Sequence, residues 1–255
     1  MPPGSGGGEL NTRRNSSANV STNSSTNSLA LTPHVMICAT MIQLHYYPGN
    51  ASMTPHIVLR ELGLPFELLQ VDRANAEHKS AAYLKLNPNG LIPVLVDGSL
   101  VLYETAAIVL HLADSQPAAA LAPPLGSTDR ATFYKWLFWL SGSVQAMMPH
   151  YFYSDRMVAP GNAAGTLEVK AQAEAKLAGY FDQIDTQLAS HGGPWLLGNQ
   201  YSALDPYTFT LCRWSRGMQR PARTLAHIGP YLQRVVQRPA VQATLAAEGL
   251  SAPWV

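Results

Sequence analysis

The sequence predicts a mixed α/β domain over residues 41–116 and an all-helical domain over residues 129–255. Three observations predict this fold class. A strand–helix–strand pattern occupies residues 42–71, a proline-led hairpin and an apolar helix follow it, and helical periodicity dominates the rest of the chain. Residues 117–128, which are rich in proline and alanine, are predicted to be a linker.

The composition restricts the classes of function. The chain has 255 residues, a formal net charge of +1 and only 13% charged residues, which disfavours nucleic acid as its main partner. Its apolar runs are too short for a membrane span. Two cysteines, Cys38 and Cys212, are too few for a disulfide framework or a metal site. We therefore expect a cytoplasmic protein with no metal, no nucleic-acid partner and no membrane partner.

The first part of the chain differs from the rest. Residues 1–40 are rich in glycine, serine, asparagine and threonine and contain few apolar side chains. Such a composition cannot bury enough apolar surface to form a core. We predict that this segment is a disordered extension, dispensable for the fold and for activity.

The predicted α/β domain begins with a strand over residues 42–47, which alternates apolar and polar side chains. Ser52 and Thr54 can cap the next helix, Pro55 suits its first turn and Gly63 ends it. A second strand over residues 66–71 follows, so the first two strands are expected to be parallel. A short helix or helical loop is predicted over residues 76–86.

A hairpin with a proline at its start comes next. Residues 93–96 and 100–103 flank the turn sequence Asp-Gly-Ser, and Pro93 belongs at the first position of a strand because it has no N–H to donate. We expect the bond between Ile92 and Pro93 to be cis. Ile92 would then direct its amide and carbonyl outward, where they can pair with an extended peptide.

Glu104 and Thr105 lie where the following apolar helix begins. Free amides and the positive end of the helix dipole attract a carboxylate there, and Glu104 can bind an ammonium group. A ligand with an amino-acid end and a peptide backbone fits such a site. The alternative interpretation is a plain hairpin followed by a capped helix.

The second half of the chain is predicted to be helical. One long helix is expected from residue 129 to about residue 148, and a core stripe recurs at helical spacing later in the chain: Leu177, Phe181, Ile184 and Leu188. Ser202 and Asp205 form a variant of a capping box, which is a structural feature. Two short helices are predicted to begin near residues 229 and 238. The order of the first half, β-α-β-α-β-β-α, is that of a thioredoxin-like domain.

Residues 41–255 resemble the soluble glutathione transferases. The segment Pro48-Gly-Asn-Ala-Ser-Met-Thr-Pro-His-Ile57 is close to a pattern of the bacterial beta class, and residues 87–105 are similar to the family's glutathione-binding hairpin. The chain departs from the beta class at Ala51, where that class has a cysteine, so mixed-disulfide chemistry is not available at this position. Gln145 and Ala146 replace a histidine–lysine pair of that class.

The resemblance implies a set of site residues. Ser52 is predicted to donate its hydroxyl to the glutathione sulfur at the start of the first helix, and Tyr46 is the second candidate for that role. His78 is expected near the glycine carboxylate of glutathione, although a solvated loop position is equally compatible with the sequence. The remaining predicted glutathione-binding residues are Ile92, Pro93, Glu104 and Thr105.

The function implied by the resemblance is glutathione S-transferase activity. A homodimer would bind glutathione as cosubstrate and transfer its thiolate to a small hydrophobic electrophile, whose identity the sequence does not specify. Two alternatives use the same fold. One is a glutathione-dependent disulfide reductase, dehalogenase or isomerase, and the other is a non-catalytic binding protein.

Overall fold

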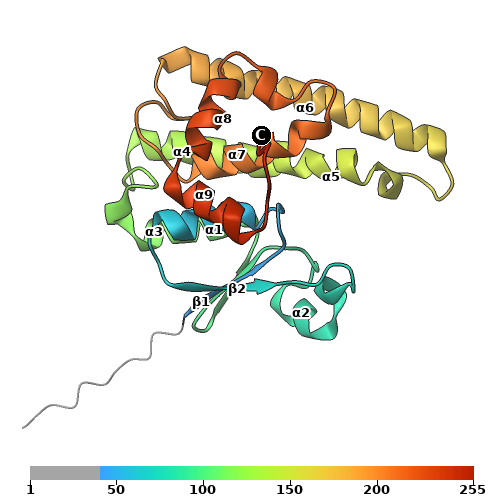
Figure 1. The fold of residues 1–255 in the computed structure, drawn as a ribbon, viewed down its shortest axis with the longest axis horizontal. Helices are drawn as coiled ribbons and strands as arrows, with labels where there is room; N and C mark the ends of the chain where they lie inside the picture. The colour runs from blue at the N-terminus through green and yellow to red at the C-terminus, as the bar shows by residue number, and fades with distance from the viewer. Residues whose placement is uncertain (1–40) are drawn as a thin grey trace, which may run out of the picture. The chain divides into compact units, whose positions relative to one another are not determined.

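The computed structural model describes residues 41–255 (Figure 1). The predicted disordered extension, residues 1–40, lies outside the described residues.

A four-stranded sheet forms the base of the first half. Its strands are β1 (Ile42–Tyr46), β2 (Phe66–Gln70), β3 (Val94–Asp97) and β4 (Leu100–Tyr103), in the spatial order β2-β1-β3-β4. β1 and β2 are parallel, whereas β3 is antiparallel to both β1 and β4. The parallel strands β1 and β2 need a crossover helix between them, whereas the antiparallel strands β3 and β4 need only a turn. This arrangement matches the predicted element order.

Helices cover both faces of this sheet. α1 (Met53–Glu61) and α3 (Thr105–Ser115) pack on the face that meets the helical half, and α2 (Ala81–Leu86) lies beyond the opposite face (Figure 1). Successive side chains of β3 alternate between the faces: Leu95 joins the large core, while Val94 joins a small cluster with Tyr83 of α2. A 3₁₀ turn, Glu77–Lys79, precedes α2. The first half is therefore a thioredoxin-like domain, as predicted.

The second half is a helical domain, also as predicted. Its helices are α4 (Thr128–Trp139), a π-helical turn (Leu140–Gln145), α5 (Ala146–Phe152), α6 (Ala163–His191), α7 (Leu204–Trp214), α8 (Ile228–Val236) and α9 (Pro239–Ala247). Short 3₁₀ turns connect them at Ser154–Met157, Ser215–Gly217 and Ala222–Thr224, and another, Pro117–Ala119, follows α3. The division into domains at residues 117–128 stays a prediction.

The helix predicted from residue 129 to about residue 148 is present, but a π-helical turn interrupts its regular geometry. α4 ends at Trp139, and the chain passes through the π-helical turn before α5 begins at Ala146. A π turn inserts one extra residue per turn and rotates the side chains that follow it. Gln145, the last residue of this turn, contacts Thr105 of the first half through its amide.

α7 runs through the core of the helical half, and its start is held by a buried carboxylate. Asp205 is fully buried and accepts hydrogen bonds from Leu196 N (2.9 Å), Ser202 N (2.7 Å) and the Tyr231 hydroxyl (2.9 Å). Burial raises the pKa of Asp205 to about 6. The reach of Asp205 back to the amide three residues earlier confirms the predicted capping interaction.

Among residues 41–255, no helix combines the length and the apolar character that crossing a membrane requires. The same residues contain no group of three or more His, Cys, Asp or Glu side chains placed to hold a metal ion. Cys212 lies in α7 and is 2% exposed, and burial raises the pKa of its thiol.

Candidate functional site

The start of α3 is the most distinctive part of the site. Glu104 precedes the helix with φ 72° and ψ 115°, a conformation that a non-glycine residue rarely adopts and that is often found at functional positions. Its exposed carboxylate has no partner among the described residues, and its carbonyl accepts the bond from Ile108 N (3.0 Å). Because Ile108 N donates the first hydrogen bond within α3, the amides of the preceding residues of this helix remain free for a carboxylate.

Gln145 of the helical half completes this end of the site. Its amide nitrogen donates to the hydroxyl of Thr105 at 3.4 Å, and its carbonyl oxygen accepts a short hydrogen bond from Tyr207 of α7. Thr105 itself is 3% exposed. In the sequence, Gln145 is noted only as the replacement for a residue of the beta class. It ends the π-helical turn, whose step Ser141-Gly142-Ser143 is a sequence signal of irregular helix.

The hairpin contributes unpaired backbone next to this helix. The bond between Ile92 and Pro93 is cis, as predicted. Neither the amide nor the carbonyl of Ile92 is hydrogen-bonded to another described residue. By contrast, the preceding carbonyl, of Leu91, accepts bonds from Tyr83 and Asn87, both at 2.9 Å. The structure thus leaves one amide and one carbonyl on the edge of the hairpin for an extended peptide.

The loop between β1 and α1 is closed by Ser52. The Ser52 hydroxyl accepts from Tyr47 N and donates to Tyr47 O, both at 3.2 Å, and its side chain is fully buried. It makes no capping bond to α1. A hydroxyl has one hydrogen to donate, and this hydrogen is directed at the Tyr47 carbonyl. The amide of Ser52, in contrast, has no acceptor within residues 41–255.

Tyr46 points away from this loop. Its hydroxyl donates to Gln70 Oε1 of β2 at 3.3 Å, and its ring packs edge-on against His56. Burial, together with the charge of Glu248, raises the pKa of Tyr46. The assignment of Tyr46 or Ser52 as hydroxyl donor to a sulfur stays a prediction, because each hydroxyl has a protein partner in this structure.

The helical half clamps the same loop from the other side. Gly49 N donates to Glu248 Oε2 at 2.7 Å, and Trp214 Nε1 donates to Gly49 O at 2.9 Å. The second carboxylate oxygen of Glu248 lies 2.8 Å from His56 Nδ1 in α1, and both side chains are fully buried. Gly49 has φ +67°, and a Cβ there would come within 3.3 Å of Arg213. The clamp fixes the loop that a bound sulfur would approach.

His78 lies beside the turn that precedes the hairpin. The turn glycine, Gly90, has φ +60° and fits so closely that a Cβ would lie 2.7 Å from His78 O. The adjacent Lys79 donates to Asn89 O at 3.3 Å. Desolvation, followed by the charges of Lys79, Arg73 and Arg156, lowers the pKa of His78. His78 is therefore close to the hairpin, and its predicted place beside the glycine carboxylate of glutathione stays a prediction.

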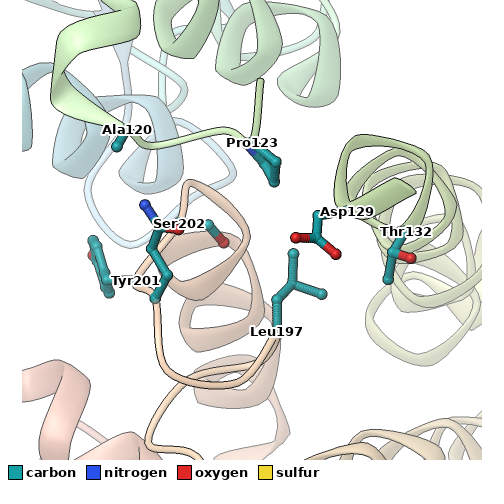
Figure 2. A pocket seen from close by; sticks show the side chains of 8 residues that line it. Ala120, Pro123, Asp129, Thr132, Leu197, Tyr201 and Ser202 are labelled. Carbon is teal, nitrogen blue, oxygen red and sulfur yellow. The ribbon is translucent and has the colours of Figure 1, made fainter. Parts of the chain in front are cut away.

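A separate cavity of about 110 Å³ lies between the α3–α4 connection, the start of α4 and the loop before α7 (Figure 2). It is lined by Ala120, Pro123, Asp129, Thr132, Leu197, Gln200, Tyr201 and Ser202. None of these residues belongs to the predicted site. The candidate site is instead the junction of the Tyr47–Ser52 loop, the hairpin and the start of α3.

Two family models match the chain. The model described as glutathione S-transferase, N-terminal domain, matches residues 51–115, and the model described as glutathione S-transferase, C-terminal domain, matches residues 157–248.

Individual proteins give the same result. Glutathione S-transferase GstA of Escherichia coli O157:H7 is 33% identical over 82% of this chain and 100% of its own length. Disulfide-bond oxidoreductase YfcG of Escherichia coli K12 is 28% identical over 82% of this chain and 96% of its own length. The structure of a sphingomonad glutathione S-transferase complexed with glutathione has a TM-score of 0.70, with 34% identity over 82% of this chain and 100% of that one. The chain belongs to the glutathione S-transferase family.

Proposed function

We propose that this protein binds glutathione at the junction of the hairpin and α3 and transfers its thiolate to a small hydrophobic electrophile. The observation that carries the proposal is the start of α3, where free amides and the unpaired carboxylate of Glu104 lie side by side. A zwitterionic amino-acid end needs this combination of an anion site and a cation site.

The other groups of glutathione match the rest of the site. The γ-glutamyl carboxylate binds the α3 amides and the Thr105 hydroxyl, and its ammonium group binds Glu104. The cysteinyl amide and carbonyl pair with the free backbone groups of Ile92 next to Pro93. The glycine carboxylate reaches the turn beside His78 and Lys79, where it would raise the lowered pKa of His78. The protein is proposed to act as a cytoplasmic homodimer, as the family resemblance implies.

The sulfur is proposed to lie at the start of α1. The free amide of Ser52 and the positive end of this nine-residue helix favour a thiolate over a thiol. This assignment keeps Ser52 as the catalytic residue but uses its backbone amide, since its hydroxyl hydrogen is directed at Tyr47. Tyr46 then acts as a packing residue under the loop.

The role of Ser52 is tested by titrating the thiolate absorbance of bound glutathione. We expect Ser52→Ala to raise the pKa of the bound thiol by less than about 0.5 unit, which corresponds to less than roughly 0.7 kcal/mol, because alanine retains the amide. Tyr46→Phe is expected to leave the pKa of the bound thiol unchanged. If the pKa of the bound thiol rises by about one unit or more in either variant, the hydroxyl removed in that variant stabilises the thiolate. That result would contradict the proposed role of the Ser52 amide.

The overall function is tested by calorimetry with glutathione and by conjugation of 1-chloro-2,4-dinitrobenzene. We expect saturable binding and formation of the thioether. A second candidate, glutathione-dependent disulfide reduction, is favoured by the similarity to YfcG. If the protein binds glutathione and uses it to reduce 2-hydroxyethyl disulfide, but does not conjugate it to the aryl halide, the reductase hypothesis is correct. If glutathione does not bind, the proposal fails.

A further inference from the structure

A group of aromatic and arginine side chains joins the two halves of the chain beside the Tyr47–Ser52 loop. Arg73, from the segment after β2, lies over the Tyr47 ring at 5.1 Å and donates to the Tyr153 hydroxyl at 3.2 Å. Arg156 lies over the Tyr153 ring, with its guanidinium carbon 4.4 Å from the ring centre. We call Tyr47, Arg73, Tyr153 and Arg156 the arginine–tyrosine cluster.

The positive charge of this cluster has no carboxylate partner. Within residues 41–255, neither Arg73 nor Arg156 forms an ion pair, whereas Arg130, Arg220 and Arg238 each have one. The acidic side chains near Arg73 are occupied by other groups: Asp72 binds Asn75, and Glu77 binds the amide of Asp72. The charges of both arginines also contribute to the lowered pKa of His78. The cluster therefore has two guanidinium groups available for an anion.

Aromatic surface connects this cluster to the proposed position of the sulfur. Phe152, next to Tyr153, is 48% exposed and packs edge-on against Trp214 at 6.5 Å. Trp214 in turn donates to the carbonyl of Gly49, three residues before Ser52. Tyr47, at the other end, is held by the Ser52 hydroxyl. An apolar ring placed beside the loop would meet Phe152, and a substituent on that ring could reach the arginines.

We propose that the second substrate is an aromatic electrophile that carries an anionic group, a carboxylate or a sulfonate, bound by Arg73 and Arg156. This inference rests on the proposed function, because it names the substrate class of the same site. Guanidinium groups bind such anions with charge-assisted hydrogen bonds. The Tyr153 hydroxyl, which accepts from Arg73, still has its own hydrogen to donate to the anion.

The chemical step leaves the anionic group unchanged. The thiol of glutathione loses its proton to solvent, and the thiolate attacks the ring carbon that carries a halide. A carbon–sulfur bond forms, the carbon–halogen bond breaks, and the halide leaves with the bonding electron pair. The anionic group only orients the ring, so we expect its contribution to be measured as a difference in kcat/KM.

A matched pair of substrates tests the proposal. The ratio of kcat/KM for 4-chloro-3,5-dinitrobenzoate to kcat/KM for its methyl ester isolates the contribution of the negative charge. We expect Arg73→Gln and Arg156→Gln each to lower this ratio about tenfold, and added salt to lower it in the unmodified protein. Arg234→Gln, an exposed arginine of α8, is the control for net charge and should leave the ratio within about twofold.

A binding measurement keeps this test independent of turnover. We expect 3,5-dinitrobenzoate, which has no leaving group, to bind more tightly than its methyl ester, with S-methylglutathione present or absent, and both arginine variants to lose this preference. That result supports an anion site formed by Arg73 and Arg156 independently of the conjugation reaction.

Two results would overturn the proposal. One is an unchanged preference for the anion in both arginine variants. The other is weakened binding of S-methylglutathione with no change in preference, which would mean that the arginines hold the glycine carboxylate of glutathione.

Discussion

Asp205→Ala is expected to lower the free energy of unfolding by about 3–5 kcal/mol, because it leaves buried partners of a charged group unpaired. The amides of Leu196 and Ser202 would lose their acceptor, and the hydroxyl of Tyr231 would keep only its longer bond, 3.3 Å, to the backbone carbonyl of residue 205. The site is fully buried, so these donors are shielded from bulk water. Urea denaturation followed by circular dichroism measures the change.

Asp185→Ala provides the matched control. Asp185 also accepts from two backbone amides, those of His227 and Ile228, both at 2.8 Å, but its side chain is only half-buried. Water can reach these amides, so the expected cost is about 1 kcal/mol, as for an ordinary helix cap. Equal losses in the two variants would contradict the importance of burial at Asp205.

The pH dependence of the Asp205 effect has a defined sign. Burial raises the folded-state pKa of Asp205 to about 6, above its ordinary value of 3.8. Between these pH values the folded chain binds a proton that the unfolded chain does not. The contribution of this protonation to the free energy of unfolding is therefore complete below about pH 4 and is lost as the pH rises through about 6. The difference in stability between the unmodified protein and Asp205→Ala should therefore be larger at pH 4.5 than at pH 7.

Glu104→Gln is expected to weaken glutathione binding about 10- to 150-fold, equivalent to about 1.5–3 kcal/mol, the contribution of a hydrogen bond to a charged group. The proposed ammonium site depends on the negative charge of Glu104, which has no protein partner among the described residues. Glutamine has nearly the same shape and the same Cβ, so the positive φ at this position is equally unfavourable in both proteins. Calorimetry with glutathione measures the loss.

A charge-matched variant shows whether the effect is local. Glu168→Gln, on the exposed surface of α6, removes the same charge away from the hairpin and should not change the affinity. If Glu104→Gln binds glutathione as tightly as Glu168→Gln does, the γ-glutamyl end of the ligand lies elsewhere.

Local signals in the sequence were sufficient for the main elements of the fold. The alternation of β1, the Asp-Gly turn and the proline before β3 each restrict the backbone within a few residues. The capping reach of Asp205 was also predictable, because both partners lie within four positions. The same reasoning placed Glu104 and Thr105 at the start of α3.

The features that the sequence did not predict depend on tertiary contacts. The π-helical turn that precedes the contact of Gln145 with Thr105 includes Ser141, Gly142 and Ser143, a signal of helix irregularity that does not specify the direction of the side chains after it. The positive φ of Glu104 is equally unexpected, because it is uncommon for residues other than glycine and glutamate is not among the residues enriched there. The bond of the Ser52 hydroxyl to the Tyr47 backbone, by contrast, is local to one loop, and the predicted role of this hydroxyl toward a sulfur stays a prediction.

The clamp on Gly49 links the site to the order in which the chain is made. Glu248, which holds the Gly49 amide, follows it by 199 residues, and Trp214, which holds the carbonyl, follows it by 165. During synthesis the thioredoxin-like half leaves the ribosome long before either partner exists. The β1–α1 loop of a nascent chain therefore lacks the Trp214 restraint until α7 has been translated, and it lacks the Glu248 restraint until the chain beyond α9 has been made. A ribosome stalled before residue 248 would carry a protein in which β1, α1 and the hairpin are complete but the Gly49 amide has not yet met Glu248.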